Sequence, residues 1–116
     1  MRALLVLLAL FLVNRPAEAQ TARSLLEGCK QFLDQVAVGK DLVVVYNGGV
    51  CSGIVTAIFH LGPQLQPSAR FCAPPNATMG DALRIVVTYI DAHPGQQETP
   101  FNILALEALR DGWPCK

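Results

Sequence analysis

The chain has 116 residues, of which 52% are hydrophobic and 16% charged, and its nine Lys and Arg balance nine Asp and Glu. Balanced charge without a basic patch argues against nucleic acid or an anionic membrane surface as the partner. The length predicts a single small domain.

The first 19 residues have the features of a secretory signal peptide. Arg2 supplies a positive n-region, residues 3–13 form an apolar run, and Ala17-Glu18-Ala19 is a small-x-small cleavage site. The run covers only about half of a membrane-spanning helix, which needs roughly 20 residues. We therefore expect cleavage after Ala19, no membrane insertion, and an exported domain formed by residues 20–116.

The mature chain opens with a strongly marked helix. Ser24 and Glu27 have the spacing of a capping box, and Gly39 ends the pattern. Between them, apolar residues repeat at helical spacing: Leu25, Leu26, Cys29, Phe32, Leu33 and Val36. Residues 41–47 are ambiguous, since they are compatible with a short strand or an extended crossing segment. Asn47-Gly48 would suit a hairpin turn, but no second strand follows.

Residues 49–61 predict a second helix, because their apolar and polar side chains fall on separate faces. Gly49, Gly53 and Ala57 recur every four residues and leave a flat strip on which another helix can pack closely. Gly62 and Pro63 end this helix. Residues 63–75 contain four prolines and predict an irregular surface loop.

A third helix begins at Thr78, which Asp81 supports as a capping partner, and stops at Pro94. Residues 84–90 are rich in β-branched and aromatic side chains, so propensity alone would predict a strand. The polar residues nevertheless occur in steps of three, four and three, at Asp81, Arg84, Thr88 and Asp91. That spacing indicates a helix. Its apolar arc is too wide for one neighbour, which indicates either a central helix or a partner.

The last helix follows a polar turn at residues 93–98. Thr99 is the expected cap and Pro100 the first helical residue, and the helix runs to about Asp111 before Gly112 and Pro114 stop it. A turn this short predicts that the third and fourth helices are antiparallel neighbours.

Four cysteines in a small exported chain indicate two disulfides. The antiparallel hairpin brings Cys72 and Cys115 to the same end, so we predict that they pair. Cys29 and Cys51 then pair by elimination. A thiol enzyme with Cys51 as nucleophile and His60 or His93 as base is the weaker alternative. No two cysteines have the spacing of a structural zinc site, and we expect no metal or cofactor.

These features predict an all-α fold, a small bundle of about four helices with two disulfides. We find no active-site pattern, so we expect a binding protein rather than an enzyme. One alternative is a small secreted carrier that holds apolar ligands in a cavity. The wide apolar arc of the third helix and the strip at Gly49, Gly53 and Ala57 favour a homodimer.

Several motifs occur in a distinctive order along the mature chain. They are Leu25-Leu-x-x-Cys29, Cys51-x-Gly53, Phe71-Cys-x-Pro74, Thr78-x-Gly80, His93-Pro94 and Trp113-Pro-Cys115. In this order the chain resembles the Tai family of type VI secretion amidase immunity proteins over nearly all its mature length. The resemblance implies a bacterial periplasmic protein, all-α and often dimeric, that binds and blocks a peptidoglycan-cleaving amidase.

An inhibitor without chemistry of its own has to fill the space that the substrate would occupy. The polar loop of residues 93–99, called here the 93–99 loop, is the predicted contact. Its candidate partner-binding residues are His93, Gly95, Gln96, Gln97 and Glu98. The alternatives are that this loop is an ordinary solvated turn, or that residues 63–75 make the contact.

Overall fold

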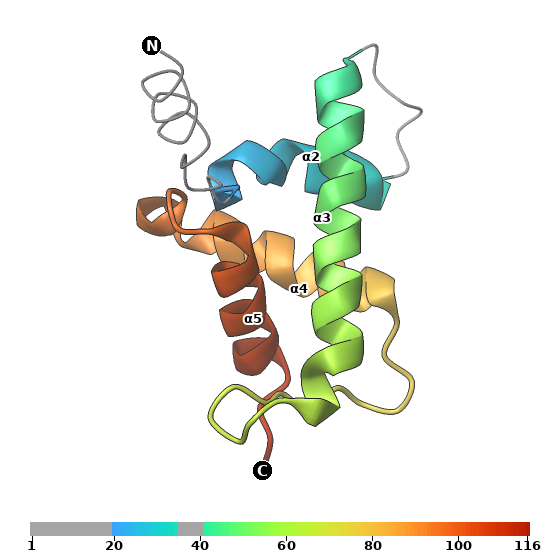
Figure 1. The fold of residues 1–116 in the computed structure, drawn as a ribbon, viewed down its shortest axis with the longest axis vertical. Helices are drawn as coiled ribbons and strands as arrows, with labels where there is room; N and C mark the ends of the chain where they lie inside the picture. Colours follow the sequence, from blue (N-terminus) through green and yellow to red (C-terminus); the bar gives the residue numbers. More distant parts are fainter. Residues whose placement is uncertain (1–19, 35–40) are drawn as a thin grey trace, which may run out of the picture.

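The computed structural model describes residues 20–34 and 41–116. The predicted signal peptide and the predicted helix end at Gly39 lie outside these residues. Four α-helices form the described part (Figure 1): α2 (Ala22–Asp34), α3 (Leu42–Leu61), α4 (Met79–Ala92) and α5 (Phe101–Gly112). Two single 3-10 turns, Gly62–Gln64 and Pro94–Gln96, follow α3 and α4. The predicted all-α fold of about four helices is confirmed.

The first helix begins earlier than the sequence predicted. Thr21, not Ser24, caps α2, because the Ser24 amide donates to the Thr21 hydroxyl oxygen at 3.3 Å. The Ser24 hydroxyl donates in turn to the Thr21 carbonyl at 2.8 Å. Glu27 takes no part in this cap and accepts a hydrogen bond from Gln31 one turn further on. The predicted Ser24–Glu27 capping box is therefore wrong by one turn.

The ambiguous segment at residues 41–47 is helical, so the strand and the hairpin turn are both excluded. Asp41 caps α3, since its carboxylate accepts a hydrogen bond from the Val43 amide at 2.9 Å. The helix then continues through Gly48 and Gly49 to Leu61, for 20 residues. The Asp41 cap and an unbroken series of helical backbone hydrogen bonds outweigh the β-propensity of three consecutive valines. Gly62 and Pro63 end the helix as predicted.

Both ends of the third helix, α4 (Met79–Ala92), were predicted correctly. The fourth helix, α5, begins one residue later than predicted. Thr78 and Asp81 form the predicted capping box of α4, and Pro94 follows its end. α5 begins at Phe101, after Pro100, and has no side-chain cap. Instead, the Phe101 amide donates to the carbonyl oxygen of Gln20 at 2.8 Å. The Gln20 carbonyl thus replaces the cap that Thr99 was expected to provide.

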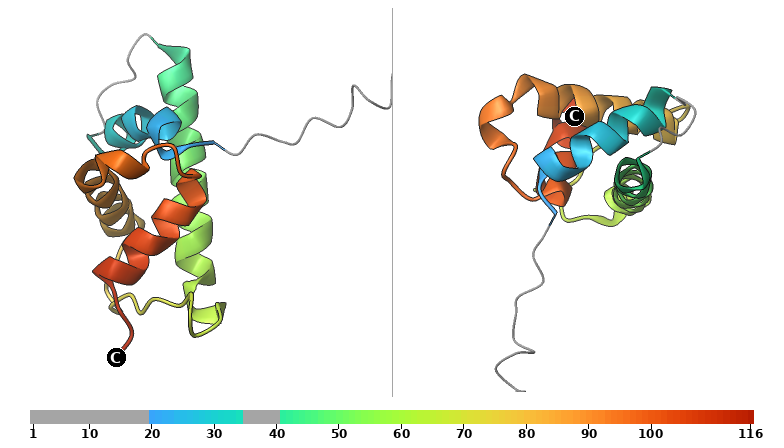
Figure 2. Two further views of the ribbon diagram at one scale, coloured as in Figure 1. Left: turned by 90° about the vertical axis from the view of Figure 1, so that its left-hand side faces the viewer. Right: turned by 90° about the horizontal axis from the view of Figure 1, so that it is seen from above.

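Each of the four helices contacts the other three. In Figure 1, α3 and α5 run along the molecule while α2 and α4 cross them, and Figure 2 shows the same arrangement from two further sides. The apolar arc of α4 is covered within one chain, since Val86 and Ile90 are fully buried and Val87 is nearly so. The wide arc therefore reflects a central helix. It no longer argues for a partner or for a ligand cavity.

Both predicted disulfides are present. Cys29 on α2 joins Cys51 on α3, and Cys72 joins Cys115 near the C-terminus. The second pair does not depend on the antiparallel hairpin used to predict it, because α4 and α5 cross steeply (Figure 1). The loop before α4 instead returns to the end of α5, where the Cys72 amide donates to the Trp113 carbonyl at 2.8 Å.

Candidate functional site

The disulfides settle the chemistry of the cysteines. Cys51 is fully buried and bonded to Cys29, so it cannot act as a thiolate nucleophile. His60 lies on the exposed face of α3, whereas His93 lies beyond the end of α4. Among residues 20–34 and 41–116, no group of three or more His, Cys, Asp or Glu side chains could hold a metal ion. The Cys29–Cys51 disulfide therefore excludes the thiol-enzyme alternative.

The 93–99 loop is a tight, internally bonded turn. Its first half is the 3-10 turn Pro94–Gln96, in which the Gln96 amide donates to the His93 carbonyl at 3.0 Å. The Thr99 amide then donates to the Gln96 carbonyl at 2.9 Å. Gly95, Gln96 and Glu98 are exposed, while Gln97 is half-buried. The loop thus presents polar groups from a fixed backbone.

His93 faces back toward the helix rather than outward. Its Nδ1 donates to the Tyr89 carbonyl oxygen at 2.7 Å, and the two rings stack with their centroids 4.1 Å apart. Burial raises the pKa of the Tyr89 phenol, and the nearby carboxylates of Glu107 and Asp111 raise it further. His93 is therefore positioned to anchor the loop to α4, whereas Gln96 and Glu98 are exposed.

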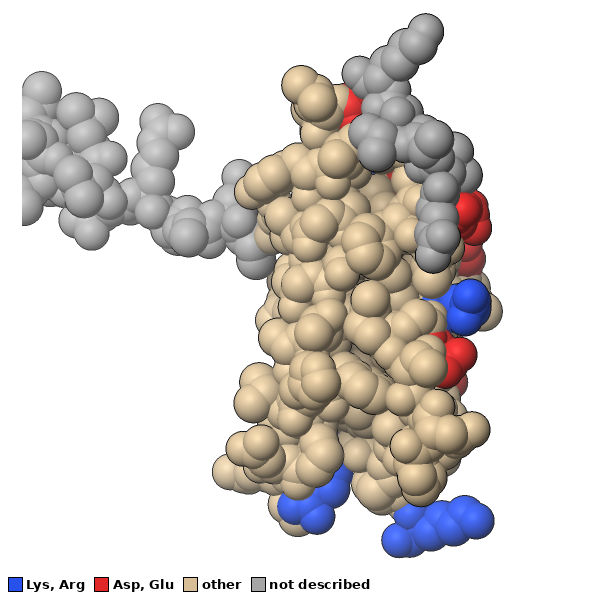
Figure 3. Space-filling view, turned by 90° about the vertical axis from the view of Figure 1, so that its right-hand side faces the viewer, with Lys and Arg blue, Asp and Glu red and all other residues tan. Residues whose placement is uncertain are grey.

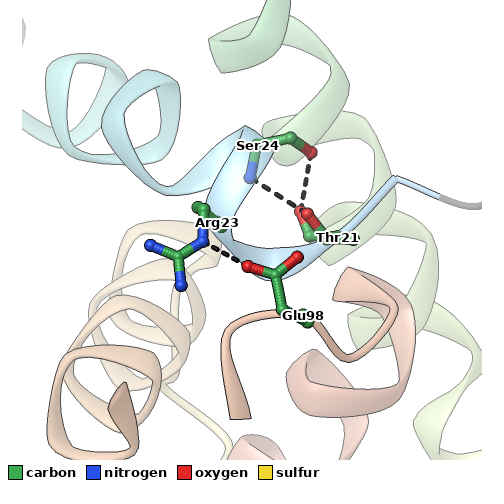
Figure 4. A network of polar contacts seen from close by, with 4 residues as sticks. All are labelled: Thr21, Arg23, Ser24 and Glu98. Atoms are coloured by element: carbon green, nitrogen blue, oxygen red, sulfur yellow. Dashed lines mark hydrogen bonds and ion pairs between the residues drawn. The ribbon is translucent and has the colours of Figure 1, made fainter. Parts of the chain in front are cut away.

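Residues 20–23 bind the far side of the 93–99 loop. The Ala22 amide donates to the Thr99 carbonyl at 3.0 Å, and the Arg23 amide donates to the Gln97 carbonyl at 2.8 Å. An ion pair links Arg23 to Glu98, and in Figure 4 these two side chains point toward each other. We call residues 20–23 and their bonds to residues 97–101 the N-terminal clasp. No local sequence pattern predicts it, because its partners are about 75 residues apart.

A second candidate surface lies on α3. One side of this helix is exposed along its whole length and is formed by the following six residues, called here the α3 face: Leu42, Tyr46, Gly49, Gly53, Ala57 and His60. Tyr46 is 64% exposed and Leu42 81%. No Lys, Arg, Asp or Glu occurs in the helix. Figure 3 shows this side of the molecule as a broad uncharged area with charged groups toward its edges.

The strip of small residues is open rather than filled by a neighbouring helix. A Cβ atom added to Gly49 or Gly53 would meet nothing within 4 Å. The close helix approach occurs one residue earlier, at Gly48, which packs on Gly28 of α2. By length and composition the stretch Leu42–Gln64 could also cross a membrane. It belongs to the folded domain, however, because Cys51 joins it to α2.

The rival loop at residues 63–75 is held mainly by aromatic packing. Phe71 is buried, and its ring centroid lies 6.3 Å from that of Trp113. The Arg70 Nε donates to the Leu65 carbonyl at 3.2 Å, which orients that side chain along the loop. This segment closes the lower end of the core in Figure 1 through Phe71, while most of its other residues are exposed.

A family model described as Rap1a immunity proteins matches residues 21–115. The chain belongs to the Rap1a immunity protein family. Membership implies that it binds a cognate effector, and both membership and the two disulfides are consistent with an exported protein. The resemblance to immunity proteins is thus supported at family level, while the narrower Tai assignment is carried into the proposal below. No curated protein and no solved structure matches the chain.

Proposed function

We propose that this Rap1a family member is a periplasmic immunity protein of the Tai type. It binds a peptidoglycan amidase delivered by type VI secretion and occludes the substrate cleft of that enzyme, which protects the producing cell. The immunity family supplies the class of function, and the resemblance of the motifs supplies the class of target. No catalytic role, metal or cofactor is assigned to the chain.

The observation that carries the proposal is the fixed, polar and exposed 93–99 loop. Two hydrogen bonds within the loop, the anchor at His93 and the N-terminal clasp restrain its backbone. A loop already ordered in the free protein loses little conformational entropy on binding, so more of the contact energy appears as affinity. Gln96 and Glu98 then offer an amide and a carboxylate, which are also the polar groups of a peptidoglycan peptide stem.

The α3 face supports the second part of the proposal, a homodimer. An uncharged face can meet its own copy in a two-fold arrangement without like-charge repulsion. Open space above Gly49 and Gly53 lets two helix backbones approach closely. A standard interface buries about 800 Å² per partner, so side chains flanking the face, such as Val43 and Leu61, would also be covered.

The function is tested by mixing purified residues 20–116 with the cognate type VI peptidoglycan amidase and measuring peptidoglycan hydrolysis. We expect a stable complex and loss of hydrolysis at one equivalent of each chain. A protein that neither binds the amidase nor protects cells that receive it would disprove the proposed function. Saturable uptake of a fluorescent lipid probe by the monomer would instead support the carrier alternative.

A further inference from the structure

Residue 98 is held on both sides by the N-terminal clasp. The carbonyl before it, that of Gln97, accepts from the Arg23 amide, and the carbonyl after it, that of Thr99, accepts from the Ala22 amide. The backbone at Glu98 is thus fixed relative to the start of α2. The only freedom left at this position is that of the side chain, and the Arg23 Nε donates to its carboxylate.

We propose that Arg23 is a positioning residue for Glu98, so that residue 23 contributes to effector binding through the 93–99 loop. This inference rests on the proposed function, because it assumes that the loop meets the effector. Arg23 acts by selecting one direction for the Glu98 carboxylate before the effector arrives. Without it, the carboxylate samples several rotamers and the effector has to select one of them.

The exposure of the pair distinguishes positioning from a contribution to folding. The Arg23 and Glu98 side chains are 62% and 71% exposed. Exposed ion pairs add little to stability, because water screens the charges and two long side chains lose rotamer freedom. Binding of an effector would remove water from the pair and strengthen it, since a charge-assisted hydrogen bond is stronger in a lower dielectric. The pair should therefore affect affinity more than stability.

Arg23 is also suited to direct contact through its remaining donors. The guanidinium is planar and carries five N–H donors, of which only that on Nε bonds Glu98. Its terminal amino groups face away from the carboxylate in Figure 4. This pair would match an effector that presents a carbonyl or carboxylate to Arg23 and, beside it, a hydrogen-bond donor to Glu98. The double-variant measurement below separates such direct contact from positioning.

The test uses the full mature protein and the cognate amidase. We expect Arg23→Ala and Glu98→Ala each to weaken binding about tenfold, and the double variant to bind no more weakly than either single variant. Arg23→Lys should recover part of the affinity. All four proteins should melt within about a degree of the wild type. Arg84→Ala, which removes an exposed ion pair on α4, is the matched control and should bind normally.

Normal binding by Arg23→Ala, or losses that add in full in the double variant, would overturn the positioning role. A second measurement keeps this outcome separate from failure of the proposed function. The side-chain rotamers of Glu98 are followed by NMR scalar couplings in the free protein, without any amidase. We expect one dominant rotamer in Arg84→Ala, as in the wild type, and averaged couplings in Arg23→Ala, because the Arg23 Nε donates to the Glu98 carboxylate. Equal couplings in the two variants would disprove positioning even if the wild type binds no amidase.

Discussion

Gly28 of α2 lies directly against Gly48 of α3. A Cβ atom added to Gly28 would be 2.5 Å from the Gly48 amide nitrogen, and one added to Gly48 would be 2.9 Å from the Gly28 carbonyl oxygen. At the same crossing, the Asn47 side-chain amide donates to the Ser24 carbonyl at 3.0 Å. Backbone contact and the nearby Cys29–Cys51 disulfide therefore fix how α2 crosses α3.

Gly28→Ala should destabilise the domain, because the new methyl group would overlap backbone atoms that cannot rotate away. We expect a loss of roughly 1–3 kcal/mol in the free energy of unfolding, measured by chemical denaturation. Gly80→Ala is the matched control in α4, where the added methyl meets only ordinary contacts at 3.6 Å or more. It should gain up to about 1 kcal/mol in helix propensity. Equal effects of the two variants would show that the crossing is not close.

The two disulfides should differ in their sensitivity to reductant. Cys29 and Cys51 are fully buried, whereas Cys72 and Cys115 are exposed. Under mild reduction we expect alkylation at Cys72 and Cys115 first, as detected by peptide mass mapping. Removing either bond as a double alanine variant should cost about 3–4 kcal/mol in the chain-entropy model. Simultaneous alkylation of all four cysteines would indicate global unfolding instead.

The capping box of α4 should be detectable in an acid titration through the pKa of Asp81. The pKa of the Asp81 carboxyl lies below its ordinary value, because it accepts hydrogen bonds from the Thr78 hydroxyl and then from the Thr78 amide. A depressed pKa in the folded state contributes stability above the unfolded pKa of about 3.9, and this is lost as the pH falls through the folded value. Thr78→Val should move the pKa of Asp81, followed by NMR, back toward the ordinary value.

The 93–99 loop is tested by replacing Gln96, Gln97 and Glu98 together with alanine. We expect inhibition of the amidase to weaken at least tenfold, roughly 1.4 kcal/mol, while the melting temperature stays nearly unchanged. The backbone bonds of the loop do not need these side chains. A double variant of the rival loop, Gln64→Ala with Gln66→Ala, should inhibit normally. Normal inhibition by the triple variant, together with weakened inhibition by the double variant, would place the contact at residues 63–75.

The α3 face is tested by Ala57→Glu, which places a charge on the exposed strip without touching the core. We expect Ala57→Glu to be a folded monomer by analytical ultracentrifugation, and we expect the wild type to sediment as a dimer at micromolar concentration. Thr88→Glu, at an exposed position of α4, should remain dimeric. A charge at Val87 or Ile90 would not test the interface, since both residues are in the core and their replacement unfolds the chain. Sedimentation of the wild type as a monomer would disprove the proposed homodimer.

Local signals in the sequence located both ends of α4 and the end of α3. The Thr78–Asp81 cap, the stops at Gly62 and Pro94, and the polar steps along α4 each depend on residues within one or two turns. The cysteine pairing was predicted correctly although α4 and α5 cross steeply, because the loop before α4 returns Cys72 to the chain end.

Features that depend on contacts between distant residues could not be read in this way. Residues 41–47 have the β-branched composition of a strand, and only the Asp41 cap and the ladder of α3 decide for a helix. The Gly strip marked α3 as a packing helix but did not reveal that Gly48 is the residue in contact. The N-terminal clasp joins segments that no periodicity connects. The 93–99 loop was thus predicted from the sequence, whereas the contacts that hold it against residues 20–23 were not.

The placement of the two disulfides also determines how the molecule would respond to mechanical pulling. Force applied between residue 20 and the C-terminus cannot extend the segments closed by Cys29–Cys51 and Cys72–Cys115. Only roughly one third of the contour length of residues 20–116 could be drawn out, at about 3.3–3.6 Å per residue. The 93–99 loop and both helices beside it lie inside the second closed segment. Tension along the chain would therefore bypass the proposed inhibitory loop.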